Sequence, residues 1–271
     1  MPGLDLAHRD AVRRPILLAL GAGIGALLVR ERRGVRQSER LAAAALETLL
    51  NAIDANDAST GAHVRRVAAY SMTLARVARL DDAMIRSIER VALFHDIGKI
   101  HEALFDIVHD QDDKVTPDER RLIATHPKRG ADVLKPLSFF YPDLAAGVLA
   151  HHERWDGSGY PHGLAGVQIP MQARVVAIAD TFDAITHRRR YRRAQSVEDA
   201  ARAIAEGSGT QFDPSLAAIV RRPRILEQFQ RIARRTWQPS ASTDGGRRHR
   251  GGSKAPDVTF RWRGGPQTSP P

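Results

Sequence analysis

The strongest constraint on the fold of this chain is a set of histidines spaced with apolar residues at helical intervals. His63 precedes Val67 by four residues, and His95 follows Ala92 by three residues in a pattern that begins at Ile85. Such spacing puts each imidazole on the apolar, inward face of a helix. A buried polar group without a partner costs about 1 to 3 kcal/mol, so the fold must supply partners for these histidines.

Three further predicted helices carry candidate ligands on their apolar faces. The first begins at the capping-box sequence Thr116-Pro117-Asp118-Glu119, the second at Pro142 and the third at Pro170. The candidate ligands on these helices are, in order, His126, the pair His151 and His152, and Asp180. Helix starts are also predicted at Ser196 and Asp213, and no strand-like alternation of useful length occurs. We therefore expect an all-α fold, a helical bundle with a binuclear metal site in its interior.

Asp96 and Lys99 stand close to His95 and indicate the chemistry of the site. An adjacent histidine and aspartate supply a neutral imidazole and a carboxylate that can bridge two metal ions, and Lys99 adds a positive charge. Such a pair on its own is more often a capping or surface pair. However, burying five or more histidines and two aspartates in one helical core without metal would leave several of them unpaired. The whole set therefore predicts a metal centre that cleaves phosphate esters.

The composition narrows the chemistry further. The 271 residues include no cysteine, which excludes disulfides, thiolate metal ligands and cysteine nucleophiles. The formal net charge is +10 and the pI is near 10.7, which favours anionic partners such as nucleotides, nucleic acid or acidic lipid headgroups. Arginines cluster in residues 188–193, which form either a phosphate contact or a solvated face.

Three regions are predicted along the chain: a basic N-terminal segment (1–37), a main domain (38–236) and a disordered basic tail (237–271). The tail is rich in Gly, Ser, Pro and Arg and has too little apolar surface to order itself. Residues 15–29 form an uncharged apolar run that reaches only about 22 Å as a helix, against a hydrocarbon core of about 30 Å. This run is either a membrane anchor or a buried or interfacial helix. If it spans, the excess of arginines after it places the main domain in the cytoplasm, tethered to the inner face of the cell membrane.

Several segments of the main domain, taken together, carry a family resemblance. The two principal ones are His95-Asp96-Ile97-Gly98-Lys99 and His151-His152-Glu153-Arg154-Trp155-Asp156-Gly157-Ser158-Gly159-Tyr160-Pro161. Further matches lie in residues 60–63, 126–127, 177–184 and 211–214. In this order, the segments resemble HD-GYP domains, the cyclic di-GMP phosphodiesterase branch of the HD phosphohydrolases, from about residue 57 to residue 216.

The resemblance implies a complete set of metal ligands. One metal ion would be held by His63, His95, Asp96 and Asp180, and the other by Asp96, His126, His151 and His152, with Asp96 as the bridge. Such nitrogen-rich, oxygen-bridged sites suit iron or manganese, and the ligand types leave zinc open. Some family members hold a third metal on a glutamate four residues before the first histidine, where this chain has Ser59. We therefore expect two divalent metal ions per chain.

The resemblance also implies a reaction, the hydrolysis of cyclic di-GMP to linear pGpG, with continuation to GMP left open. A hydroxide activated by the two metals would attack phosphorus, with Asp96 and Lys99 as catalytic residues. Contacts with the substrate would come from Lys99, Arg189, Arg192 and Tyr160. The loop Gly159-Tyr160-Pro161 would shape the mouth of the site or dock signalling proteins. Nucleic acid is not expected as a partner.

Three positions depart from the usual residues of the family. They are His101 and Ala103, where glycine and proline are usual, and Arg190, where proline is usual. These departures affect loop shape and the fit of the substrate, and they leave the metal ligands untouched.

Two alternative functions stay open. The first is an HD phosphohydrolase that acts on another nucleotide, against which the Gly159-Tyr160-Pro161 loop argues. The second is a non-catalytic module that binds cyclic di-GMP or a signalling protein. The complete ligand set argues against that module, because a degenerate domain would be expected to lose ligands. Metal analysis of anaerobically purified protein, combined with turnover of cyclic di-GMP, separates these functions.

Ser59 provides a direct test of the number of metal ions. If the ligands are in register, Ser59 lies close to His63 at the start of its helix, where a carboxylate could reach an ion beside the pair. We expect Ser59→Glu to raise the metal content from two towards three per chain, and Ser59→Ala to leave it at two. In the alternative role of helix N-cap, Ser59→Ala would cost roughly 1 kcal/mol of stability. A third tightly held ion in the wild type would contradict the expected ligand set.

Overall fold

The structure is a computed structural model. In the part of the chain that it describes, the fold is built from helices. The described residues are 34, 37–55, 57–100, 116–187 and 194–234. The chain divides into two units, residues 1–47 with 250–271, and residues 48–249. In the first unit, residues 37–47 are helical. The second unit contains all the predicted metal ligands and is the subject of the following paragraphs.

The second unit starts with helical residues 48–55 and continues through a series of helices. The α-helices are, in order, α2 (Ala58–Val77), α3 (Asp82–Phe94), α5 (Pro117–Ile123), α6 (His126–Leu134), α7 (Pro142–Leu149), α8 (Met171–Thr186), α9 (Val197–Glu206), α10 (Pro214–Val220) and α11 (Pro223–Ala233). Three short 3₁₀ helices connect them: η1 (Ile97–Ile100), η2 (Lys135–Leu137) and η3 (Gly166–Gln168). No strand occurs among the described residues, which contain two isolated β-bridges, Asp156 with Ala165 and Ser208 with Phe212. The predicted all-α fold class is confirmed.

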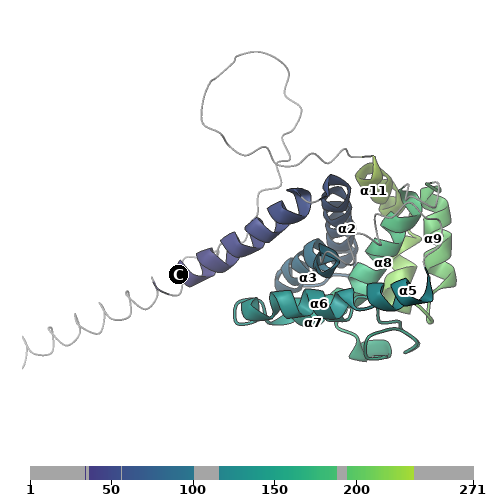
Figure 1. Cartoon of the computed structure of the whole chain (residues 1–271). Coiled ribbons are helices and arrows are strands. Elements are labelled where there is room, and N and C mark those ends of the chain that lie inside the picture. The colour runs from purple at the N-terminus through teal and green to yellow at the C-terminus, as the bar shows by residue number, and fades with distance from the viewer. Residues whose placement is uncertain (1–33, 35–36, 56, 101–115, 188–193, 235–271) are drawn as a thin grey trace, which may run out of the picture. The chain divides into compact units, whose positions relative to one another are not determined.

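The core forms where α2, α3 and α8 pack against one another, as Figure 1 shows. Tyr70 of α2, Phe182 of α8 and Phe229 of α11 are fully buried there. Their ring centroids lie 4.7 to 5.1 Å apart in tilted or edge-to-face pairs, the arrangement that aromatic quadrupoles favour. This aromatic cluster fixes α11 to the α2 and α8 helices that carry His63 and Asp180.

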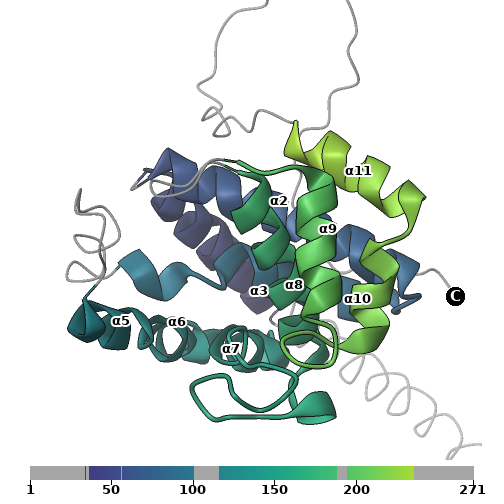
Figure 2. The ribbon, with the colours of Figure 1, turned by 90° about the vertical axis from the view of Figure 1, so that its right-hand side faces the viewer.

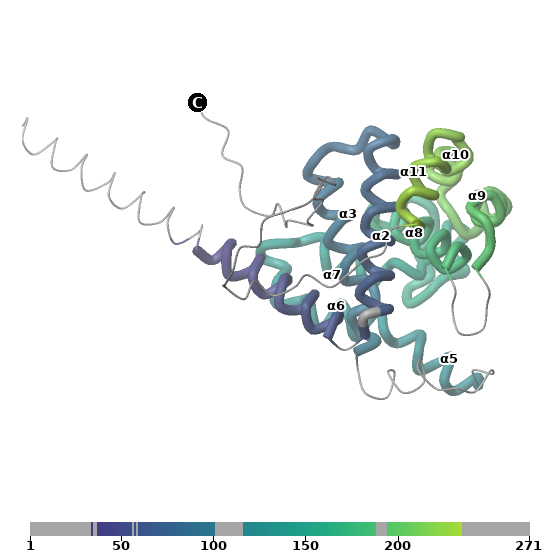
Figure 3. The backbone as a smooth tube through the Cα atoms, turned by 90° about the horizontal axis from the view of Figure 1, so that it is seen from above, coloured from purple at the N-terminus to yellow at the C-terminus, as the bar shows by residue number. Residues whose placement is uncertain are grey.

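Two groups of helices flank this core on different sides. Helices α6 and α7 pack against each other and lie on one side of α2 and α8, whereas α9, α10 and α11 lie on the other (Figures 2 and 3). Helix α7 contacts α3 and α8, and α6 contacts η1. The elements that carry His95, His126 and His151 are therefore brought together on the α6 and α7 side.

The local signals for helix starts are largely confirmed. Thr116 and Ser196 each form a full capping box, and the side chain of Asp213 caps α10. The N-cap role considered for Ser59 is wrong, because Asp57 caps α2. The Asp57 carboxylate accepts from the backbone N–H groups of Ser59 at 2.8 Å and Thr60 at 3.1 Å, and the Ser59 hydroxyl donates to it at 2.8 Å.

Among the described residues, no helix is both long enough and apolar enough to cross a membrane. The apolar run of residues 15–29 and the basic tail of residues 237–271 lie outside the described residues.

Candidate metal centre

The apolar spacing predicts that the ligands lie within helices. In the structure, most of them lie at helix ends instead. His95 is the C-cap of α3, His126 is the first residue of α6, and His151 and His152 follow the end of α7 at Leu149. The break before His126 has a local cause, because Pro127 favours the first turn of a new helix. His63 and Asp180 do lie within helices, α2 and α8 respectively.

A close approach of backbones brings Asp96 to the start of α6. A Cβ added at Gly98 in η1 would lie 2.1 Å from the carbonyl oxygen of His126 and 2.7 Å from the backbone nitrogen of Gly130. Glycine at position 98 therefore lets η1 pack directly on α6. The turn that carries Asp96 is held against the helix end that carries His126.

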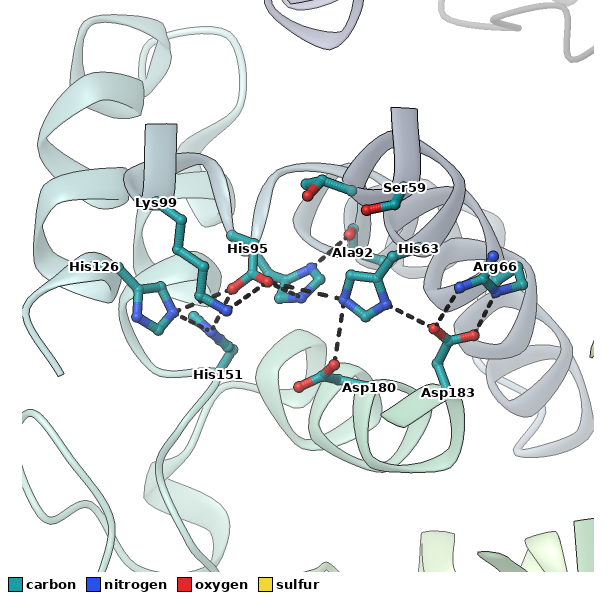
Figure 4. Close-up of polar contacts among 12 residues, drawn as sticks. Ser59, His63, Arg66, Ala92, His95, Lys99, His126, His151, Asp180 and Asp183 are labelled. Carbon is teal, nitrogen blue, oxygen red and sulfur yellow. Dashed lines mark hydrogen bonds and ion pairs between the residues drawn. The ribbon is translucent and has the colours of Figure 1, made fainter. Parts of the chain in front are cut away.

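The structure gathers the seven predicted ligands into one site. Two groups, each with its ligand atoms within 4.8 Å of one another, are His63 with His95 and Asp180, and His126 with His151 and His152. Figure 4 shows His63 beside Asp180, and His126 with His151 on the side of Lys99.

Asp96 stands between the two groups, with one carboxylate oxygen towards each. Its Oδ2 lies 3.5 Å from His95 Nε2 and 3.8 Å from His63 Nε2. Its Oδ1 lies 3.2 Å from His126 Nε2 and 3.9 Å from His151 Nε2. One carboxylate is therefore shared by the two groups of ligand atoms, and its role as a bridge between metal ions stays a prediction.

Each of four histidines is oriented by an acceptor on its Nδ1 atom. His95, His126 and His151 lie with Nδ1 at 2.8, 2.7 and 2.6 Å from the carbonyl oxygens of Ala92, Ile123 and Val148. Nδ1 of His63 lies 2.7 Å from Oδ2 of Asp183. Carbonyl oxygens only accept, so the proton of each neutral ring in the first three must be on Nδ1. The Nε2 lone pairs then face the interior of the site, as metal ligation requires.

The electrostatics keep these ligands in the forms that bind metal. Burial lowers the pKa of His95 and His151, and it lowers the pKa of His152 to about 4, so the three rings are neutral near pH 7. Burial alone would raise the pKa of Asp96, but the ammonium group of Lys99, whose Nζ is 2.7 Å from Oδ2, holds it well below its usual value. Asp96 is therefore an ionised carboxylate.

The buried polar atoms of the site fit a bound cation. Nε2 of His126 lies 3.1 Å from Nε2 of His151, and the Nδ1 atom of each ring faces a carbonyl oxygen, so two neutral rings here would point their lone pairs at each other. Within the described residues, His63 Nε2, His95 Nε2 and Asp96 Oδ1 are buried and make no hydrogen bond. Leaving such atoms unpaired costs about 1 to 3 kcal/mol each, and a metal ion between them removes that cost. These His and Asp groups could hold metal, and their nitrogen and oxygen donors suit a divalent transition metal.

Asp183 is a site residue that the sequence analysis missed. It is 2% exposed, and its carboxylate accepts from His63, from Arg66 Nε at 2.7 Å and from Arg66 Nη2 at 2.9 Å (Figure 4). Burial alone would raise the pKa of Asp183, but hydrogen bonds from His187, His63 and Arg66 hold it well below its usual value. Its position three residues after Asp180 was the available signal, because that spacing puts both carboxylates on one side of α8.

Tyr160 packs directly on one of the predicted ligands. Its ring is stacked on His152, with centroids 4.9 Å apart and planes 28° apart. Burial, with the charges of Asp96 and Asp180, raises the pKa of Tyr160 to about 12, so the phenol is neutral. The predicted substrate contacts of Arg189 and Arg192, and the departures at His101, Ala103 and Arg190, lie outside the described residues.

Two features hold the loop that carries Tyr160. The buried carboxylate of Glu153 accepts from the backbone N–H groups of His162 at 2.7 Å and Leu164 at 3.0 Å. A Cβ at Gly159 would lie 2.4 Å from the backbone nitrogen of Arg154, so the chain folds back too closely for any side chain there. The loop is therefore tied to the residues that immediately follow His152.

Asp183→Asn should weaken metal binding at the His63 group, because the neutral amide is a poorer acceptor for the His63 Nδ1–H. Replacing a direct partner of a metal ligand typically costs roughly 10- to 100-fold in affinity, and we expect a loss in that range. Mn²⁺ titration of chelator-treated protein would measure it. Asp132→Asn is the matched control, since Asp132 is exposed and pairs with Lys128 at the surface. Equal Mn²⁺ affinity in the Asp183 variant and the control would contradict the orienting role.

Comparison with known proteins agrees with this fold and site. The family model described as HD domain matches residues 47–216. The cyclic di-GMP phosphodiesterase response regulator RpfG of Xanthomonas campestris is 37% identical over 186 residues, which are 68% of this chain and 49% of that protein. The 3'3'-cGAMP-specific phosphodiesterase 2 of Vibrio cholerae is 34% identical over 173 residues, 64% of this chain and 33% of that protein.

A solved structure of a cyclic GMP-AMP specific phosphodiesterase from V. cholerae has a similar fold, with a TM-score of 0.50 at 23% identity, over 70% of this chain and 52% of that one. This chain thus spans about half the length, or less, of the two relatives compared above. The family model nevertheless covers more than half of the sequence, including all seven of the gathered ligands. The chain belongs to the HD domain family.

Proposed function

We propose that this chain is a metal-dependent phosphodiesterase that hydrolyses cyclic di-GMP to linear pGpG. The observation that carries the proposal is the position of Asp96, whose two oxygens face two separate groups of ligand atoms. Relatives named as cyclic di-GMP phosphodiesterases support the substrate, among them RpfG. Analysis of the reaction products in the turnover experiment described below shows whether pGpG is hydrolysed further to GMP.

The proposed site holds two divalent metal ions that share Asp96. One ion takes His63, His95 and Asp180, and the other takes His126, His151 and His152. Iron or manganese suits this donor set, and zinc is a further candidate. When bound, the ions supply Lewis-acid stabilisation of charge on the phosphoryl oxygens and activation of the attacking water.

The protein's own contribution is to position and to supply charge. The rings of His95, His126 and His151 are held by backbone carbonyl groups, so they need little rearrangement when a substrate binds. Lys99 is partly exposed and places its ammonium group 2.7 Å from Asp96 Oδ2, at the edge of the site. There it can contact a non-bridging oxygen of a phosphodiester and stabilise the charge that develops on it.

The alternative substrate of the same class is 3'3'-cGAMP, because a relative that is 34% identical to this chain in sequence is named as specific for it. Turnover of cyclic di-GMP and 3'3'-cGAMP by one metal-loaded preparation, compared as kcat/KM, decides between them. Metal binding without turnover of either would favour the non-catalytic module. Phosphate contacts of Arg189 and Arg192, substrate or partner contacts of the Gly159-Tyr160-Pro161 loop, and membrane contact through residues 15–29 stay predictions.

Asp96→Ala should lose both metal ions and all phosphodiesterase activity, because it removes the anion that the two groups share and leaves two cations to repel each other. Metal analysis of anaerobically purified protein, with turnover of cyclic di-GMP, measures both losses. Asp132→Ala removes an exposed carboxylate from α6 and is the matched control. Retention of two metal ions per chain by the Asp96 variant would refute its bridging role.

Lys99→Ala should keep the metal ions and lower kcat about a hundredfold, the scale of losing one group that stabilises charge in the transition state. The reason is that Lys99 supplies charge near the phosphate without being a ligand. Lys128→Ala, which removes an exposed lysine that pairs with Asp132, is the control. If the Lys99 variant also lost metal, its role would be to support the Asp96 carboxylate instead.

A further inference from the structure

His187 connects the C-terminal end of α11 to the metal centre. It is the C-cap of α8 and lies four residues after Asp183 on that helix. Its Nδ1 atom lies 3.0 Å from Oδ1 of Asp183, and its Nε2 atom lies 3.2 Å from the carbonyl oxygen of Ala233, the last residue of α11. The ring therefore bridges α8 and α11 through a contact between residues 46 positions apart in the chain.

Among the described residues, three groups that can accept hydrogen bonds face the nitrogens of the His187 ring. Besides the Asp183 carboxylate and the Ala233 carbonyl group, Oγ1 of Thr186 lies 3.2 Å from Nδ1. The hydroxyl of Thr186 already donates to the carbonyl oxygen of Phe182 at 2.8 Å, so it can only accept from the histidine. A hydrogen on Nδ1 satisfies the Asp183 side of the ring, and a hydrogen on Nε2 satisfies the Ala233 side.

The contact with Asp183 reaches a predicted metal ligand in one further step. The carboxylate is rigidly held, since Arg66 donates to both oxygens, His187 faces Oδ1 and His63 faces Oδ2. His63 is 13% exposed in its side chain and Asp183 is 2% exposed, so neither can exchange these partners readily for water. A change at His187 therefore alters the acceptor that orients the His63 ring.

We propose that His187 is a positioning residue that ties the last turn of α11 to the His63 side of the metal centre. The inference rests on the proposed metal centre and assigns His187 no contact with metal or substrate. It predicts an asymmetry between the two groups of ligands. The group of His63, His95 and Asp180 depends on His187, whereas His126 and His151 are oriented by carbonyl groups and do not.

The test is a Mn²⁺ titration of the chelator-treated 271-residue chain and its variants. Asp180→Ala and His152→Ala identify which binding phase belongs to each group. We expect His187→Ala to weaken the phase that Asp180→Ala abolishes by about three- to tenfold, less than the roughly 10- to 100-fold typical of a direct partner of a ligand. The other phase should stay within about twofold.

A conservative variant separates positioning from mere stability. His187→Asn keeps a donor near the place of Nδ1 and loses the contact with Ala233, so it should recover most of the Mn²⁺ affinity if donation to Asp183 is what matters. His162→Ala, at an exposed histidine, is the matched control. Equal weakening of both phases, unchanged affinity in His187→Ala, or an Asn variant as weak as the Ala variant would overturn the inference. Absence of Mn²⁺ uptake by the wild type would instead refute the proposed metal centre on which it rests.

Discussion

The structure depends on a close contact in the core between atoms that accept hydrogen bonds, the Nε2 atoms of two histidines and a carboxylate oxygen of Asp96. Nε2 of His126 and Nε2 of His151 approach to 3.1 Å, and Oδ1 of Asp96 lies 3.2 Å from the same His126 atom. Neutral imidazoles whose protons are fixed on Nδ1 offer only acceptors to this space. Burial raises the cost, because it removes the water that would otherwise hydrogen-bond to those atoms. A helical core of this kind is stable with a cation at its centre, so binding of metal and stability of the fold are physically linked.

The fold meets this demand by placing ligands where backbone groups are free to orient them. Residues at a helix end lie close to carbonyl groups that accept from side chains, and His95, His126 and His151 each use the carbonyl oxygen three residues earlier. The close packing of η1 on α6, which Gly98 permits, then brings two of these helix ends together around Asp96. The helix ends thus orient the rings of His95, His126 and His151, and they also bring these ligands close together.

The sequence predicted the helical class, the buried histidines and the seven residues that the structure gathers, because apolar spacing and the resemblance to HD-GYP domains both bear on them. It did not predict the helix ends at Ala150 and Thr125, since apolar spacing continues unchanged across a short break. It also missed Asp183. Periodicity puts Asp180 and Asp183 on one side of α8, and only the packing of α2 against that helix decides which carboxylate meets Nε2 of His63 and which meets Nδ1.

That distinction makes the two groups of ligands chemically unequal. Three rings of the site are oriented by neutral carbonyl oxygens, whereas His63 is oriented by a carboxylate that is itself held by Arg66. An anionic acceptor makes the imidazole a stronger electron donor than a neutral one does. The His63 side therefore combines a histidine that has an anionic partner with the carboxylate of Asp180, while the other side relies on His126, His151 and His152. In the proposed metal centre, the ion beside His63 would therefore have the more electron-rich set of ligands.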